Sequence, residues 1–302
     1  LSFNNFIVAF RALLGSPDQP SPAEMQRFAD FQLQVLPPPN PVRGLDDSLT
    51  AAQQRGKDFY LGARPSDGAT IPGLEETKFN CNGCHVLDPA QGLFGTGRNA
   101  SLETTPQTVK IPHLRNLYTK VGMFGFPGPP NAGFQGDQIR GFGLLKDGSI
   151  DNLFSFFNGP GFRPRPEIGF PEDAPDQTRR DVEQFMLAFD TDLAPIVGQQ
   201  VTLNRAHAAA RRVDLLIQRA EAPFNSKELG GAVRECDLVA QVVLGGCLRS
   251  FRYDPMARKF ISTDGTTRLS DRALRALAAT PGQEVTYTCF PPGSGARLTT
   301  GR

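Results

Sequence analysis

Residues 81–85 have the sequence Cys81-Asn82-Gly83-Cys84-His85, a C-x-x-C-H motif. Two thiols at this spacing can add to both vinyl groups of one porphyrin. A histidine directly after the second thiol can then bind the iron from one face. The motif is the attachment signature of a c-type haem, so we expect one covalently attached haem c on Cys81 and Cys84, with His85 as an axial iron ligand.

The motif also has two simpler explanations. It could be a C-x-x-C redox pair followed by an incidental histidine, or half of a zinc site. A structural zinc site needs a second pair of ligands, and the sequence has no other C-x-x-C and no H-x-x-x-H. Covalent haem is therefore the favoured interpretation.

Charge and hydropathy exclude several other classes of function. The chain has 32 basic and 31 acidic side chains and a formal net charge of +1, which gives no electrostatic basis for binding nucleic acid. We find no signal peptide and no long apolar run, so we expect no transmembrane segment and a soluble chain, either a mature form or part of a larger multi-domain protein. Haem c is attached outside the bacterial cytoplasm, which predicts a periplasmic or extracellular location.

The chain changes character along its length. Period-3.6 apolar patterns predict helices over 3–14, 21–35, 48–61, 149–158, 178–189 and 203–221. Strand-like runs follow at 238–244, 248–253, 259–262 and 284–290, with Gly245-Gly246 as a hairpin turn. We therefore divide the chain into an N-terminal helical segment with a Pro-rich connector, a haem domain, a connecting helix and a small β-rich module, over 1–47, 48–200, 201–222 and 223–302.

Three cysteines lie outside the haem motif: Cys236, Cys247 and Cys289. They are compatible with an oxidising compartment. In a tight hairpin, the usual rise per residue would place Cys236 and Cys247 more than about 15 Å apart, which is too far for a disulfide. Cys289 is the better partner for Cys236, and buried free thiols are the alternative.

The sixth position of the haem iron decides between electron transfer and small-molecule chemistry. Met123 lies in the glycine-rich segment 122–148, where the backbone can approach a porphyrin closely, whereas the other methionines have packing or turn explanations. We expect this segment to be an ordered loop against the haem and Met123 to be the second axial ligand, with His113 as the alternative.

Residues 48–190 resemble the second haem domain of the bacterial di-haem cytochrome c peroxidase and methylamine-utilisation family. Besides the haem motif, the resemblance rests on A-Q-Q-R-G-K at 52–57, on K-I-P-H-L-R-N at 110–116, which matches the family pattern K-x-P-x-L-R-N, and on D-G-S-I-D-N-L at 147–153. The L-R-N pattern is the most specific of these motifs. The resemblance implies a mainly α, cytochrome c-like haem domain with long Gly/Pro-rich loops, here followed by a small β-rich module.

The resemblance also suggests roles for individual residues. His85 would be the proximal ligand, and Met123 falls near the family's distal ligand segment. Arg115 and Asn116 would lie near the haem edge, where a guanidinium can pair with a propionate. The alternative is a surface arginine and a helix-capping asparagine.

Three features depart from the family. The chain has one C-x-x-C-H motif where the family has two haems, and peroxide cleavage in that family belongs to the other haem domain. A long insertion separates Met123 from Asp147, and the resemblance does not cover 223–302.

These observations favour single-electron transfer at a His/Met-ligated haem, with a redox partner protein and without catalytic residues. One alternative is an enzyme, part of a cytochrome c peroxidase-like oxidoreductase whose other haem domain is missing. Another is a haem-based sensor or docking protein.

Overall fold

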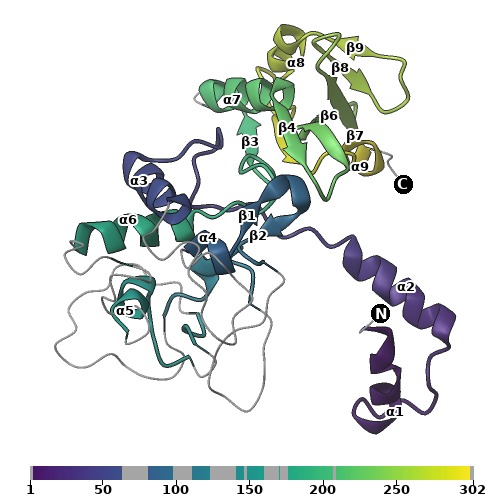
Figure 1. The fold of residues 1–302 in the computed structure, drawn as a ribbon. Helices are drawn as coiled ribbons and strands as arrows, with labels where there is room; N and C mark the ends of the chain where they lie inside the picture. Colours follow the sequence, from purple (N-terminus) through teal and green to yellow (C-terminus); the bar gives the residue numbers. More distant parts are fainter. Residues whose placement is uncertain are drawn as a thin grey trace. The chain divides into compact units, whose positions relative to one another are not determined.

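The computed structural model shows two compact units, Leu1–Pro37 and Pro38–Arg302 (Figure 1). The structure describes residues 3–62, 81–97, 111–122, 141–145, 148–159, 170, 176–206 and 209–299.

The first unit is helical. It contains η1 (Asn4–Val8), α1 (Ala9–Ala12) and α2 (Pro22–Leu33). A capping box begins α2, since the Ser21 hydroxyl accepts a hydrogen bond from Glu24 N and the Glu24 carboxylate accepts one from Ser21 N. Met25 is fully buried, which confirms its expected packing role.

In the second unit, α3 (Ala51–Leu61) packs closely on α6 (Asp176–Leu187). Gly56 allows this approach, because a Cβ built at this position would lie 2.0 Å from the Asp181 carbonyl oxygen. Arg55 on α3 also binds Asp181 on α6. Its Nε and Nη2 donate hydrogen bonds of 2.7 Å and 2.9 Å to the two carboxylate oxygens.

The part around the haem motif consists of short elements joined by loops. These are α4 (Cys81–Cys84), β1 (Leu87–Asp88), η2 (Pro89–Gln91), β2 (Leu93–Phe94), η3 (Leu117–Thr119) and α5 (Leu153–Phe157). The helix predicted from 149 begins only at Leu153, because Asn152 rather than Ser149 accepts the capping hydrogen bond, from Ser155 N.

Aromatic and aliphatic side chains from these elements and from α3 and α6 form one core. Its buried members are Tyr60, Phe94, Leu114, Leu117, Leu144, Leu153, Phe157, Phe170, Val182, Phe185, Met186 and Phe189. Met186 is thus a core residue, which agrees with the packing explanation expected for it.

The C-terminal half contains a six-stranded antiparallel sheet with the order β3-β10-β6-β7-β8-β9. Its strands are β3 (Gln200–Leu203), β6 (Asp237–Leu244), β7 (Cys247–Asp254), β8 (Lys259–Ser262), β9 (Arg268–Leu269) and β10 (Val285–Phe290). Gly245 and Gly246 join β6 to β7 with φ of 59° and 77°, as a two-residue hairpin turn requires.

Three helices and a separate two-stranded hairpin accompany this sheet. They are α7 (Ala210–Glu221), α8 (Asp271–Leu277), α9 (Gly295–Thr299) and the antiparallel pair β4 (Pro223–Ser226) and β5 (Gly231–Arg234). Figure 1 shows α7 and α8 beside the large sheet.

The predicted fold class, a mainly α haem domain with a small β module, is wrong. The described residues combine helices with the six-stranded sheet, and α4 and α5 are only 4 and 5 residues long. The sheet also includes β3, whose side chains alternate between exposed and buried.

The helix predicted over 203–221 begins at Ala210, since Leu203 belongs to β3. The sequence did not reveal β3, because its alternating pattern is only four residues long and directly precedes a longer helical pattern.

Cys236 and Cys289 form a disulfide with a Cα–Cα distance of 5.3 Å, which confirms the predicted pairing. It joins the start of β6 to its neighbour β10, 53 residues further along the chain. Cys247 is exposed at the start of β7.

The disulfide should contribute substantially to stability, because it closes a long loop in the unfolded chain. We expect replacement of both Cys236 and Cys289 by alanine to lower the free energy of unfolding by about 4 kcal/mol, measured by urea denaturation. Cys247→Ala is the matched control and should change it by less than about 0.5 kcal/mol. Equal midpoints for the two proteins would contradict this assignment.

Gly56→Ala tests the contact between α3 and α6. On helix propensity alone, alanine would stabilise α3 by about 1 kcal/mol. Because the new methyl group overlaps the backbone of Asp181, we expect a net loss of about 1–3 kcal/mol in unfolding free energy. Gln54→Ala, on the exposed face of α3, is the control, and a stabilised Gly56→Ala protein would show that the helices are further apart than described.

Candidate functional site

Helix α4 positions the two thiols of the haem motif. Cys81 and Cys84 are its first and last residues, so one helical turn places both side chains on the same face. The turn continues into His85, whose N–H donates to Cys81 O at 2.9 Å. The Asn82 side chain accepts a hydrogen bond from Leu87 N at 2.8 Å and fixes the exit of the chain.

The imidazole of His85 is oriented by the backbone. Its Nδ1 lies 2.8 Å from Gly95 O. A carbonyl only accepts, so Nδ1 carries the proton and Nε2 keeps its lone pair for a metal. Burial lowers the pKa of His85, and hydrogen bonding by the backbone of Gly95 and Pro112 opposes this effect. The lowered pKa favours neutral imidazole, the form that binds metals.

The loop that carries Gly95 is tied to both neighbouring segments. Its backbone hydrogen bonds run from Gly95 N to Val86 O (2.8 Å), from Gly97 N to Cys84 O (3.0 Å) and from Leu114 N to Phe94 O (3.0 Å). Gly95 has φ of 80°, and a Cβ there would meet the Leu114 side chain at 2.5 Å, so the position requires glycine.

Tyr60 connects this site to the core. Its ring is fully buried, with centroids 5.3 Å from that of Phe185 and 5.8 Å from that of Phe189. Its hydroxyl donates a hydrogen bond to His85 O. Burial, followed by the charges of Cys81 and Cys84, raises the pKa of Tyr60 well above its usual value, so the hydroxyl remains a donor.

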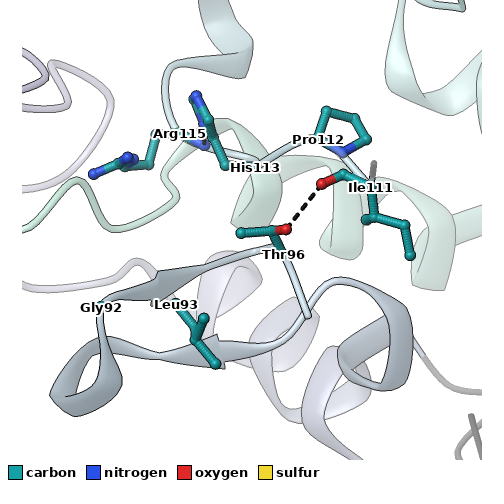
Figure 2. Close-up of a pocket in the computed structure, with 7 residues that line it drawn as sticks. All are labelled: Gly92, Leu93, Thr96, Ile111, Pro112, His113 and Arg115. Carbon is teal, nitrogen blue, oxygen red and sulfur yellow. Dashed lines mark hydrogen bonds between the residues drawn. The ribbon is translucent and has the colours of Figure 1, made fainter. Parts of the chain in front are cut away.

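A cavity of about 410 Å³ lies beside the haem motif (Figure 2). Its lining residues are Gly92, Leu93, Thr96, Ile111, Pro112, His113 and Arg115. Figure 2 shows the hydrogen bond of 2.8 Å from Thr96 Oγ1 to Ile111 O that joins its two sides. Neither the two thiols nor His85 lines this cavity. It is lined in part by Gly92, Leu93 and Thr96, next to the Gly95 that orients His85.

Arg115 lies on the edge of this cavity. Its Nη1 is 2.7 Å from Glu228 Oε1, and its guanidinium lies 5.0 Å from the centroid of the Phe94 ring. The Arg115 side chain is 17% exposed, so it is not a free surface group. Pairing of Arg115 with a haem propionate stays a prediction.

Asn116 adopts a left-handed conformation with φ of 61° and precedes η3. Its side chain makes no capping hydrogen bond, while its carbonyl accepts from the N–H and hydroxyl of Thr119. Its Oδ1 is buried and has no hydrogen-bond partner in the described part of the chain. Its expected place near the haem edge also stays a prediction.

Several predicted residues are not in the described ranges. Met123 is among them, as are Lys110, Asp147 and most of the glycine-rich segment. The second axial ligand and the course of that loop therefore stay predictions. His113, the alternative ligand, is exposed, and its Nδ1 accepts a hydrogen bond from Arg115 N at 3.2 Å.

Sequence reasoning missed three residues of the site: Tyr60, Gly95 and Glu228. Tyr60 ends an apolar helical stripe and Gly95 lies in a G-T-G run, so both had a local signal. Glu228 had none, because its partner Arg115 is 113 residues away in the sequence.

Comparisons with protein-family models, with curated proteins and with solved structures gave no match to the chain. In the described ranges no cluster of three or more His, Cys, Asp or Glu side chains is arranged to hold a metal ion. Within the same ranges, no helix is both long and apolar enough to span a membrane.

Tyr60→Phe tests the link between the core and the haem motif. The substitution keeps the ring but leaves the part-buried His85 carbonyl without its donor, so we expect the free energy of unfolding to fall by about 1–2 kcal/mol. Urea denaturation at neutral pH measures the change. Tyr118→Phe, at a less buried hydroxyl, is the control, and equal losses in both variants would contradict a specific role for Tyr60.

Proposed function

We propose that the chain carries one haem c, attached through Cys81 and Cys84, and that it transfers single electrons with His85 and Met123 as axial ligands. The observation that carries the proposal is the geometry at α4. Two thiols lie on one face of one turn, and the next residue is an imidazole whose Nδ1 is bound by Gly95 O. This donor set fits a haem c, and it is not the closed four-ligand set of a structural zinc site.

When bound, the haem would supply a one-electron redox couple whose potential depends on its ligands and surroundings. The protein's contribution is to hold the ligand rigidly. The hydrogen bond from His85 Nδ1 to Gly95 O fixes the ring and increases its basicity, and Tyr60 fixes the His85 backbone. The adjoining core of buried phenylalanines offers an apolar, water-poor surrounding.

The motif resemblance supports the same function. Two members of the K-I-P-H-L-R-N stretch, Ile111 and Leu114, are buried, and the segment is bonded to the haem-motif loop through Thr96 and Phe94. We infer that it serves as a wall of the haem site.

A periplasmic or extracellular location is part of this proposal. The disulfide between Cys236 and Cys289 supports it, since such bonds persist in oxidising compartments. In such a compartment the chain would exchange electrons with a redox partner protein.

Expression in a periplasm with the c-type haem attachment machinery tests the proposal. We expect a covalent haem that survives denaturation and gives a pyridine haemochrome spectrum with one haem per chain. Double replacement of Cys81 and Cys84 by alanine should abolish attachment, whereas Cys247→Ala should leave it intact. A wild-type chain without covalent haem would refute the proposal.

The same preparation tests the second ligand. We expect low-spin ferric haem with the weak far-red charge-transfer band of thioether ligation, and loss of that band in Met123→Ala. Met25→Leu, in the first unit, should keep the band. High-spin ferric iron that reacts rapidly with peroxide would favour a peroxidase-like enzyme instead.

A further inference from the structure

The ion pair between Arg115 and Glu228 joins two distant parts of the chain. Arg115 belongs to the K-I-P-H-L-R-N stretch, the proposed wall of the haem site, and Glu228 lies in the turn between β4 and β5. The two charged atoms are 2.7 Å apart, and the side chains are 17% and 31% exposed. Partial burial makes such a pair less screened by salt than a pair on the open surface.

Arg115 is held from more than one side. Its guanidinium lies over the Phe94 ring, and its backbone N–H donates to His113 Nδ1. Its Nε is buried and has no hydrogen-bond partner in the described part of the chain. The positive charge is therefore fixed at the cavity edge, next to the loop that orients His85.

Glu228 is held by a buried anchor. The carboxylate of Asp192, which is 2% exposed, accepts three hydrogen bonds from the turn. The donors are Ser226 Oγ (3.0 Å), Lys227 N (3.1 Å) and Glu228 N (2.7 Å). Ser226 Oγ in turn accepts from Leu229 N at 3.0 Å. These bonds fix the backbone of the turn that carries Glu228. The position of Glu228 is therefore set by the fold, unlike that of a side chain on a mobile surface loop.

We propose that Glu228 is a positioning residue of the haem site, which holds the Arg115 guanidinium over Phe94 and offsets its charge. This inference rests on the proposed function. Reduction adds a negative charge to the iron, so an uncompensated positive charge nearby favours the reduced form. Glu228 thus lowers the reduction potential, and Asp192 acts through Glu228.

Redox titration of the haem-loaded protein tests this role. Glu228→Gln should raise the midpoint potential, and Glu228→Asp, which keeps the charge, should stay closer to the wild-type value. Asp192→Asn should raise it less than Glu228→Gln, because it only loosens the turn. Glu284→Gln, at an exposed carboxylate beside Gly282, is the matched control and should leave the potential unchanged.

A double-mutant cycle separates positioning from general charge effects. We expect Glu228→Gln to shift the potential less in an Arg115→Gln background than in the wild type. The urea unfolding of the same four proteins should show a non-zero coupling between the two residues, a readout that needs no haem.

The outcomes are distinguishable. A haem-loaded protein whose potential is the same with and without Glu228→Gln overturns this inference alone. Equal shifts for Glu228→Gln and Glu284→Gln overturn it as well, since they reveal a general charge effect. Absence of covalent haem from the wild type overturns the proposed function and this inference together.

Discussion

The buried hydroxyl of Tyr60 is the interaction on which the arrangement of the site depends. It comes from α3, whose close approach to α6 is possible only with glycine at position 56. It ends on the carbonyl of His85, directly after the two thiols. A part-buried carbonyl that loses its donor is destabilising, so the core and the haem motif stabilise each other. The position of the imidazole is thereby coupled to helix packing rather than to a flexible loop.

Local signals in the sequence predicted local structure well. The helix predicted from residue 21, the Gly245-Gly246 turn and the strands around it all occur, because each depends on residues close together in the chain. The pairing of Cys236 with Cys289 was also predictable, since strand geometry excluded the nearer cysteine.

Long-range features were not predictable in this way. β3 has only four residues, and its place in the sheet depends on pairing with β10, far along the chain. The predicted fold class was wrong because the helical patterns dominated the prediction and the extent of the sheet was underestimated. For the candidate site, the motif identified Cys81, Cys84 and His85, but the carbonyl that orients His85 depends on a loop closure that periodicity does not encode. The contact between Arg115 and Glu228 was equally unpredictable, because the two residues are 113 positions apart in the sequence.

The pairing of β3 with β10 also has a consequence for the order of folding. Thr288 pairs with Gln200, so the first strand of the large sheet has to wait for a segment 88 residues further along the chain. Contacts of such high sequence separation form slowly, and an unpaired strand edge is prone to aggregation in the meantime. We therefore expect the maturation of this protein to depend on chaperones that shield the edge of β3 until β10 has been made.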